Sequence, residues 1–250
     1  MDPTPLPEPR GSVVIAVLNE EANIAAVSAE LAAAFGAGGD FEVVFVDDGS
    51  TDGTAAAIAR EQAKNPSIRL LRHDRRCGKT AALFTGISAA RGAWVATMDG
   101  DGQNDPADLV RMFELAFAAV GPAPLVAGIR TRRDDPLSRL IATRIANRFR
   151  RSVLADACPD TGCGMKAFRR DDFLRLPAFE GLHRFLPALF QLYGHPLVCR
   201  PVSHRARLAG RSKYTNLGRA LVGLADLAGV VWLRARTTLP RTVREERPER

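Results

Sequence analysis

Residues 94–103 read WVATMDGDGQ, an apolar stretch typical of a strand that ends in two carboxylates and an amide at alternate positions. Oxygen ligands gathered in this way repel one another unless a hard cation joins them, and Mg²⁺ or Mn²⁺ commonly bridges such carboxylates to the phosphates of a substrate. Asp99, Asp101 and Gln103 therefore indicate a divalent-metal site. The alternative explanation is a Gly/Asp turn that closes the strand.

Outward from this segment, short apolar stretches alternate with longer helical ones through the first half of the chain. The expected strands cover residues 12–17, 41–46, 68–71, 93–98 and 125–128. The expected helices cover residues 23–35, 54–65, 80–90 and 106–119. Asp105 is a suitable N-cap for the last of these helices, and Pro106 stands at the first helical position, where its missing N–H is tolerated. The repetition predicts an α/β fold with a doubly wound, mostly parallel sheet.

Polar segments follow four of these strands. They are 17–20 (VLNE), 47–50 (DDGS), 73–79 (HDRRCGK) and 99–103 (DGDGQ). In doubly wound sheets ligands bind at the carboxyl ends of the strands, so these segments should meet at one edge. Beyond residue 130 the pattern loosens, and we expect helices at 136–154 and 182–193, strands at 165–168 and 197–202, and a final helix from residue 216 to about 233.

The net charge is distributed very unevenly. Residues 1–125 hold 10 basic and 17 acidic side chains, whereas residues 126–250 hold 25 basic and 11 acidic ones. The second half should therefore meet an anionic partner. Nucleic acid is disfavoured, because no helix-turn-helix, zinc-finger or aromatic-studded sheet pattern is present and aromatic residues make up only 6%. A phosphorylated substrate or an acidic membrane surface fits the charge better.

Gly78-Lys79-Thr80 at the start of a helix suggests a phosphate-binding P-loop, which would indicate a protein that hydrolyses nucleoside triphosphates. The P-loop pattern requires glycine five positions before Gly78, where the backbone must approach the phosphates closely. His73 occupies that position, and Arg75, Arg76 and Cys77 crowd the loop. This hypothesis is therefore the weaker one, although it stays open as an alternative of another class.

Five ordered segments together resemble the family 2 glycosyltransferases, and more closely the dolichol-phosphate mannose and glucose synthases and bacterial polyprenyl-phosphate glycosyltransferases. These segments are 12–21 (SVVIAVLNEE), 44–54 (VFVDDGSTDGT), 77–106 (CGKTAALFTGISAARGAWVATMDGDGQNDP), 160–170 (DTGCGMKAFRR) and 204–214 (HRARLAGRSKY). The resemblance implies a GT-A fold, in which a nucleotide-binding half is joined to an acceptor-binding half. It also implies a GDP- or UDP-sugar donor and a Mg²⁺ or Mn²⁺ cofactor.

The resemblance carries over roles position by position. The metal ligands would be Asp99, Asp101 and Gln103, and the catalytic residues Asp101 and Arg130. The acceptor phosphate would contact Arg130 and Arg139. The donor would be bound by Ala16, Leu18, Glu20, Val46, Asp48, Lys79, Asp99, Gly100, Arg207 and Lys213. Where the family has PTYNE this chain has AVLNE at 16–20, so the donor base stays undetermined.

The chemistry of the acceptor supports a phosphate. A hydroxyl acceptor normally needs a general base near neutral pH, whereas a phosphate monoester has a second pKa of about 6 and arrives as a dianion that needs only cations to position it. The basic second half suits this task, and direct displacement would invert the anomeric carbon. The same-fold alternative transfers sugar to a hydroxyl of lipopolysaccharide or another glycan, with an essential carboxylate base.

The expected organisation is a flexible segment at 1–11, a glycosyltransferase domain at 12–215, an amphipathic helix at 216–236 and a charged tail at 237–250. The apolar stretch 220–233 is shorter than the roughly 20 residues of a spanning helix, and residues 1–11 lack a signal-peptide pattern. The helix at 216–236 either packs on the core or lies in a membrane interface, which a polyprenyl-phosphate acceptor would favour. We expect a cytoplasmic protein, peripheral on the cytoplasmic face of the membrane, and a separate membrane-anchoring subunit is a candidate partner.

Overall fold

The computed structural model describes residues 8–36, 40–131, 147–206, 216–238 and 240, and for residues 216–221 it describes the backbone alone. The chain divides into two compact units, Met1–Tyr214 and Thr215–Arg250. In the second unit the described residues form helix α8 (Asn216–Arg236), which has Arg234 and Arg236 in its last turn. No helix in the described part of the chain is long and apolar enough to cross a membrane.

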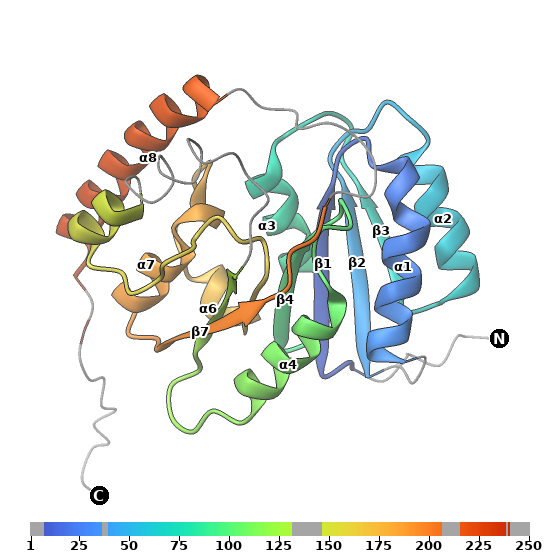
Figure 1. Cartoon of the computed structure of the whole chain (residues 1–250), viewed down its shortest axis with the longest axis horizontal. Coiled ribbons are helices and arrows are strands. Elements are labelled where there is room, and N and C mark those ends of the chain that lie inside the picture. The colour runs from blue at the N-terminus through green and yellow to red at the C-terminus, as the bar shows by residue number, and fades with distance from the viewer. Residues whose placement is uncertain (1–7, 37–39, 132–146, 207–215, 239, 241–250) are drawn as a thin grey trace, which may run out of the picture. The chain divides into compact units, whose positions relative to one another are not determined.

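A seven-stranded sheet with the order β3-β2-β1-β4-β6-β5-β7 forms the centre of the first unit (Figure 1). Neighbouring strands are parallel except where β6 pairs with β4 and with β5. The mostly parallel sheet predicted from the sequence is confirmed, with one antiparallel strand contributed by the second half. The strands are β1 (Gly11–Val17), β2 (Phe41–Asp47), β3 (Ile68–Arg72), β4 (Trp94–Asp99), β5 (Leu125–Arg130), β6 (Lys166–Arg169) and β7 (Leu197–Val202).

Helices cover both faces of the sheet (Figure 1). Helices α1 (Glu21–Phe35), α2 (Thr54–Lys64) and α4 (Pro106–Phe117) share one apolar core with Ile15, Phe45 and Met98 of the strands. Helix α3 (Lys79–Ala89) lies on the opposite face, so close to it that a side chain at Gly86 would collide with Val14 and Val46. Since successive side chains of a strand point to opposite faces, Val14 and Ile15 pack against different helix layers.

Several expectations for the elements are confirmed and one is wrong. All five expected strands and four expected helices of the first half are present, and Asp105 accepts a hydrogen bond from the Ala107 N–H at 3.0 Å as an N-cap. The helix expected at 182–193 is instead a 3-10 turn, η1 (Leu182–Arg184), followed by α7 (Leu186–Leu192). Pro187 stands in the first turn of α7, where its missing N–H is tolerated and a new helix can begin.

Among the described residues of the second half, the short helix α6 (Arg170–Leu174) is an element that the sequence did not indicate. The strands expected at 165–168 and 197–202 are present as β6 and β7. Of the helix expected at 136–154, residues 147–154 are helical and residues 136–146 lie outside the described part of the chain.

The register of the strands brings the carboxyl ends of the parallel strands, two of which carry acidic residues, together at one edge of the sheet. We name it the carboxyl edge. Val17 pairs with Asp47 and Ala16 with Asp99, so β1, β2 and β4 finish side by side. Because β6 is antiparallel, it begins at this edge, and its first residue Lys166 pairs with Thr97 of β4. The carboxyl edge therefore collects the ends of the parallel strands and the start of β6.

The opposite edge, the amino edge, is closed around one buried acid. Glu42 is 2% exposed and accepts hydrogen bonds from the Ser12 hydroxyl at 2.7 Å, the Arg69 guanidinium at 2.7 Å and the Arg91 backbone N–H at 2.5 Å. The Arg91 side chain adds a further bond at 3.0 Å. Burial alone would raise the pKa of Glu42, but these donors outweigh it and hold the pKa below the ordinary value of 4.5.

Candidate active site

At the carboxyl edge, Asp99 forms an ion pair with Lys79, which is the first residue of α3. Both side chains are about a third exposed, at 35% and 34%. Burial would raise the pKa of Asp99, but the charges of Lys79 and Lys166 outweigh it and lower the pKa. Burial likewise disfavours the charged form of Lys79, yet the charge of Asp99 holds the Lys79 pKa above its ordinary value. The pair is therefore fully ionised at neutral pH and remains open to solvent.

The loop that follows β4, residues 100–104, is compact and rich in oxygen atoms, and we name it the metal loop after the ion predicted for it. Asp101 is 8% exposed, and its Oδ1 accepts a hydrogen bond from the Gln103 N–H at 3.1 Å. The side-chain amide nitrogen of Gln103 donates to the Arg205 carbonyl at 3.2 Å, which leaves the amide oxygen of Gln103 as its ligand atom. Two carboxylates and one amide oxygen form the all-oxygen donor set that Mg²⁺ and Mn²⁺ prefer, so these residues fit the metal that was predicted here.

A glycine-rich loop, residues 160–165, packs directly against Asp99. A side chain at Gly164 would lie 2.5–2.7 Å from the Asp99 carboxyl atoms, and one at Gly162 would lie 3.0 Å from Arg130 Nη2. The Thr97 hydroxyl donates to the Gly164 carbonyl at 2.7 Å and fixes the loop to β4. Only glycine at position 164 lets this backbone approach the acid so closely, because any Cβ there would displace it.

Arg130, at the end of β5, is held by Asp160. Its Nε and Nη2 each donate to one carboxylate oxygen of Asp160 at 2.8 Å, and its backbone N–H also donates to Asp160 at 3.2 Å. A two-point arginine–carboxylate pair fixes the orientation of the guanidinium while using two of its five N–H groups. Arg130 is therefore a rigidly placed cation at the carboxyl edge.

Two basic groups beside Asp99 were not singled out from the sequence. Lys166 is 4% exposed and donates to the Thr161 and Cys163 carbonyls at 3.3 and 2.5 Å, and burial lowers its pKa. His183 of η1 shares a 2.9 Å hydrogen bond with the Thr80 hydroxyl. Burial, followed by the charges of Lys79 and Lys166, holds the pKa of His183 well below 6.5, so its imidazole is neutral at pH 7.

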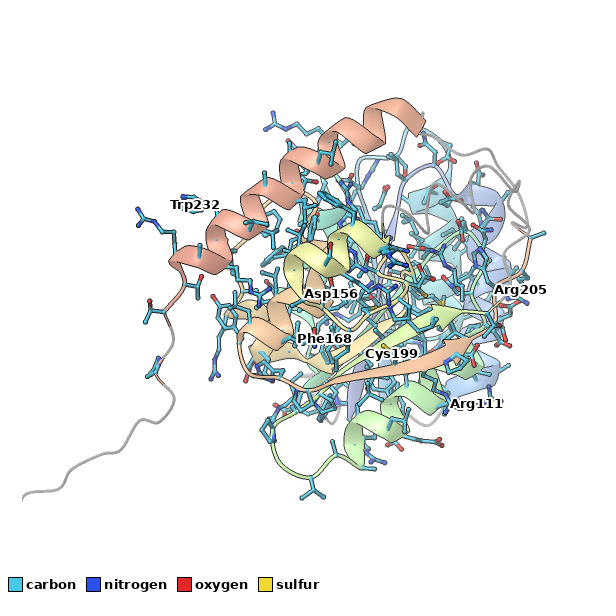
Figure 2. The ribbon with its side chains drawn as sticks, turned by 60° about the vertical axis from the view of Figure 1, so that its left-hand side comes forward. Arg111, Asp156, Phe168, Cys199, Arg205 and Trp232 are labelled. Atoms are coloured by element: carbon cyan, nitrogen blue, oxygen red, sulfur yellow. The ribbon has the colours of Figure 1, made fainter. Side chains whose placement is uncertain are left out.

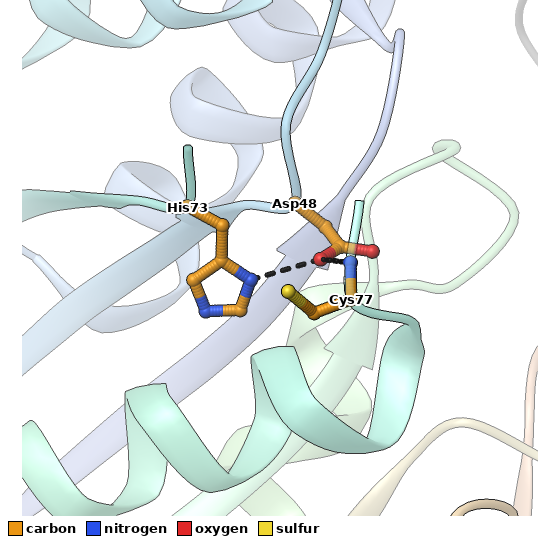
Figure 3. A group of neighbouring side chains, drawn as sticks. All are labelled: Asp48, His73 and Cys77. Carbon is orange, nitrogen blue, oxygen red and sulfur yellow. Dashed lines mark hydrogen bonds and ion pairs between the residues drawn. The ribbon is translucent and has the colours of Figure 1, made fainter. Parts of the chain in front are cut away.

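Asp48 organises the loop between β3 and α3 (Figure 3). Its carboxylate accepts hydrogen bonds from the Cys77 and Gly78 N–H groups, both at 2.8 Å, and from His73 Nδ1 at 2.8 Å. In a P-loop the backbone N–H groups surround a phosphate, whereas here two of them surround a carboxylate of the protein itself. The loop geometry thus argues against the P-loop hypothesis.

Asp48, His73 and Cys77 also form a possible metal-binding group, with ligand atoms within 4.8 Å of one another (Figure 3). Both ring nitrogens of His73 are engaged, Nδ1 with Asp48 and Nε2 with the Thr85 hydroxyl at 2.9 Å. A thiol and an imidazole would suit a softer ion than Mg²⁺ or Mn²⁺. The hydrogen bonds account for this group as a brace of the loop, and the hard-metal prediction stays with residues 99–103.

The remaining donor-site candidates of the first half lie around the end of β1. Glu20 accepts a hydrogen bond from the Asn23 side chain at 2.7 Å, and Ala16 and Leu18 are partly exposed. Val46 is fully buried and lies against α3, and Gly100 is buried against Val17. Direct contact of these residues with a nucleotide stays a prediction.

A sequence profile described as "Glycosyl transferase family 2" matches residues 12–176. The chain belongs to glycosyl transferase family 2. The region matched contains the whole carboxyl edge up to β6, including the metal loop, the glycine-rich loop and Arg130.

Curated relatives of this family 2 chain act on polyprenyl phosphates by name. The dodecaprenyl-phosphate galacturonate synthase of Rhizobium johnstonii is 33% identical over 88% of this chain and 66% of its own length. The undecaprenyl-phosphate 4-deoxy-4-formamido-L-arabinose transferase of Aeromonas hydrophila subsp. hydrophila is 32% identical over 81% of this chain and 62% of its own length. The chain thus spans slightly less than two thirds of these relatives.

Two solved structures of glycosyl-transferring enzymes share the fold of this chain. A mannosyltransferase from Pyrobaculum calidifontis in complex with GDP-Man and Mn²⁺ is 25% identical, with a TM-score of 0.59 over 78% of this chain and 55% of that one. Glucosyl-3-phosphoglycerate synthase from Mycobacterium tuberculosis, with Mn²⁺, UDP and phosphoglyceric acid, has a TM-score of 0.65 at 20% identity, over 92% of this chain and 80% of that one. The expected GT-A fold is confirmed.

The structure therefore brings together part of the site predicted for this family 2 protein. Asp99, Asp101, Lys79 and Arg130 meet at the carboxyl edge, and Asp48 braces a neighbouring loop. Arg139, Arg207 and Lys213 lie outside the described residues. Sequence reasoning missed Asp160, Lys166 and His183, although Asp160 and Lys166 stand in the quoted segment 160–170, where an acid and a lysine flank a glycine pair.

Proposed function

We propose that this chain is an inverting, metal-dependent glycosyltransferase that moves a sugar from a GDP- or UDP-sugar to a polyprenyl phosphate. The observation that carries the proposal is the pairing at the carboxyl edge of an acidic, oxygen-rich loop with a cluster of cations. Asp99 and Asp101 come from the end of β4, and Lys79, Arg130 and Lys166 approach from three other elements. Such a site suits a reaction between two phosphate-bearing substrates.

On the donor side, Asp99, Asp101 and Gln103 would hold Mg²⁺ or Mn²⁺, and the Pyrobaculum and Mycobacterium structures both contain Mn²⁺. The ion would neutralise charge on the departing nucleoside diphosphate. Lys79 already lies against Asp99 and is placed to bind a donor phosphate once the acid engages the metal. Ala16, Leu18, Glu20, Val46, Asp48 and Gly100 are proposed to line the nucleotide site, with Arg207 and Lys213 closing over the donor phosphates.

On the acceptor side, the phosphate monoester would attack as a dianion without a general base. Arg130, which Asp160 holds rigidly, would orient the phosphate oxygens in line with the bond that breaks. Arg139 is proposed as a second contact to this phosphate. The names of the relatives supply the class of acceptor, since dodecaprenyl and undecaprenyl phosphates are both polyprenyl phosphates.

We further propose that the protein works at the cytoplasmic face of a membrane, as a peripheral protein whose α8 lies in the interface. The helix carries Trp232 beside Arg234 and Arg236, a combination that suits the level of lipid headgroups. An anionic membrane would also suit the basic second half of the chain. A membrane-anchoring partner subunit is compatible with this arrangement.

A direct transfer assay tests the proposal. Purified protein with Mn²⁺ is incubated with a panel of UDP- and GDP-sugars and undecaprenyl phosphate, and the lipid products are identified by mass spectrometry. We expect one sugar to be transferred to the phosphate, with EDTA stopping the reaction and the Asp101→Asn variant inactive. Transfer to lipopolysaccharide or another glycan hydroxyl, with none to the lipid phosphate, would instead establish the same-fold alternative.

A further inference from the structure

The segment that follows β7 is attached to the metal loop through one residue, Arg205. The Arg205 N–H donates to the Gln103 carbonyl at 3.0 Å, and the Gln103 side-chain amide donates back to the Arg205 carbonyl at 3.2 Å. Next to this pair, Asn104 and His204 form an isolated antiparallel bridge. Residues more than 100 positions apart in the chain are therefore joined at Gln103, one of the proposed metal ligands.

The side chain of Arg205 holds the same loop from a second direction. Its Nε donates to the Gly102 carbonyl at 2.9 Å, and its Nη2 donates to the Asn104 carbonyl at 3.2 Å. Nη2 also forms an ion pair with Glu30 of α1. The guanidinium thus links α1, the metal loop and the end of β7, and Figure 2 shows Arg205 at the edge of the molecule where these segments lie.

We propose that Arg205 is a positioning residue for the divalent metal: it fixes the backbone on both sides of Gln103 and thereby presets the oxygen ligands of the loop. This inference rests on the proposed function. Within the loop itself, the Gln103 N–H donates to Asp101 at 3.1 Å and the Asp99 N–H donates to the Asn104 side chain at 3.4 Å, and both bonds are local. Gly102 also has a positive φ of 75°, a conformation that a free loop would leave easily.

Residues that hold metal ligands in place without contacting the ion increase the affinity for the metal, because a loop that is not held must be ordered each time that the ion binds. Loss of a residue that orients metal ligands typically weakens binding by about 10- to 100-fold. Lysine cannot replace Arg205 fully, since a single ammonium group lacks the planar fork that reaches two carbonyls and Glu30 together. The Arg205→Lys variant should therefore lie between the wild type and Arg205→Ala.

The test measures Mn²⁺ binding to the full chain without any donor, by electron paramagnetic resonance of free Mn²⁺, for the wild type, Arg205→Ala and Arg205→Lys. The matched control is Arg111→Ala, which removes an exposed arginine of α4 (Figure 2). The ion pair of Arg111 with Asp108 stays within its own helix. We expect Arg205→Ala to weaken Mn²⁺ binding about 10- to 100-fold, Arg205→Lys to weaken it less, and the control to bind as the wild type does.

A second readout does not depend on the metal. Hydrogen exchange of the amides of residues 100–104 in metal-free protein should be faster in Arg205→Ala than in the wild type, while exchange in the core strands β1 and β2 stays unchanged. In transfer assays the Mn²⁺ concentration for half-activation should rise, and kcat should recover at high Mn²⁺. These results together would support the positioning role, because global destabilisation would alter all strands alike.

The outcomes separate the two proposals. If the wild type and Arg205→Ala bind Mn²⁺ equally, or if exchange at 100–104 is unaltered, Arg205 has no positioning role and the proposed function still stands. If the wild type binds no Mn²⁺ and transfers sugar without it, the metal assignment fails and the inference fails with it. Should Arg205→Ala not fold, an Arg205→Lys protein with wild-type Mn²⁺ affinity would equally overturn the inference.

Discussion

The acidic side chains at the two edges of the sheet differ in their exposure to solvent and in the hydrogen bonds that they accept. At the amino edge, Glu42 is 2% exposed and accepts hydrogen bonds from Ser12, Arg69 and Arg91. At the carboxyl edge, Asp99 keeps 35% of its side chain exposed and is paired with Lys79, which is also partly exposed. A buried acid whose oxygen atoms accept several hydrogen bonds from the protein stabilises the fold. A partly exposed acid with a single ionic partner can exchange that partner for a ligand.

The largest effect on activity is expected when an acid of the carboxyl edge is removed. We expect Asp101→Ala to lower sugar transfer by about 10³-fold or more, because it removes a proposed ligand of the metal that would neutralise charge in the transition state. Transfer rates and thermal unfolding would be measured side by side. Asp171→Ala, at an exposed position of α6, is the control for a carboxylate outside the site. Full activity in Asp101→Ala would remove the metal assignment.

Removing the acid of the amino edge should lower the stability of the fold and leave the transfer activity nearly unchanged. Glu42→Ala leaves the Arg69 and Arg91 side chains and a buried hydroxyl without their acceptor, so we expect unfolding to become easier by about 3 kcal/mol. Urea denaturation measures this change. Under conditions where the variant is folded, its transfer rate should stay within a few-fold of the wild type. A folded but inactive variant would show that the two edges are not independent.

The close approach of the glycine-rich loop to Asp99 offers a sharper test within the carboxyl edge. A Cβ at residue 164 would lie 2.5 Å from the Asp99 carboxylate, so Gly164→Ala must move either the loop or the acid. We expect transfer to fall by about 10²-fold, with a smaller loss of stability of about 1–2 kcal/mol. Gly229→Ala, where nothing lies within 4 Å, is the matched control. Activity near the wild-type level would mean that the position of Asp99 is not critical.

The smallest expected effect is the pH dependence that Glu42 contributes to stability. Its folded-state pKa is lowered, so its contribution is fully present above the unfolded-state pKa near 4.5 and is lost as the pH falls through the folded-state pKa. The stability difference between the wild type and Glu42→Gln should therefore be constant near neutral pH and shrink below about pH 4.5. Urea titrations at several pH values measure it, and a difference that grows on acidification would contradict the assignment.

Much of the fold could be predicted from the sequence because its signals are local. The apolar stretches of β1 to β5 and the helices between them lie within short windows, and a parallel β-α repeat has few ways to fold. Asp99 and Asp101 could be proposed as metal ligands for the same reason, since both stand at the end of one apolar strand. Similar logic failed at residues 182–193, where a proline in the first turn of α7 divides one apolar stretch into a 3-10 turn and a helix.

The sequence by itself determined which strand ends carry the acids and that the second half of the chain is strongly basic. Only the tertiary structure decided which partners complete the site. The antiparallel β6 brings Lys166 beside β4, the glycine-rich loop reaches Asp99, and Arg205 meets the metal loop from a distance of about one hundred residues. Such contacts join segments far apart in the chain, and their geometry depends on packing and register, which no local pattern of residues encodes.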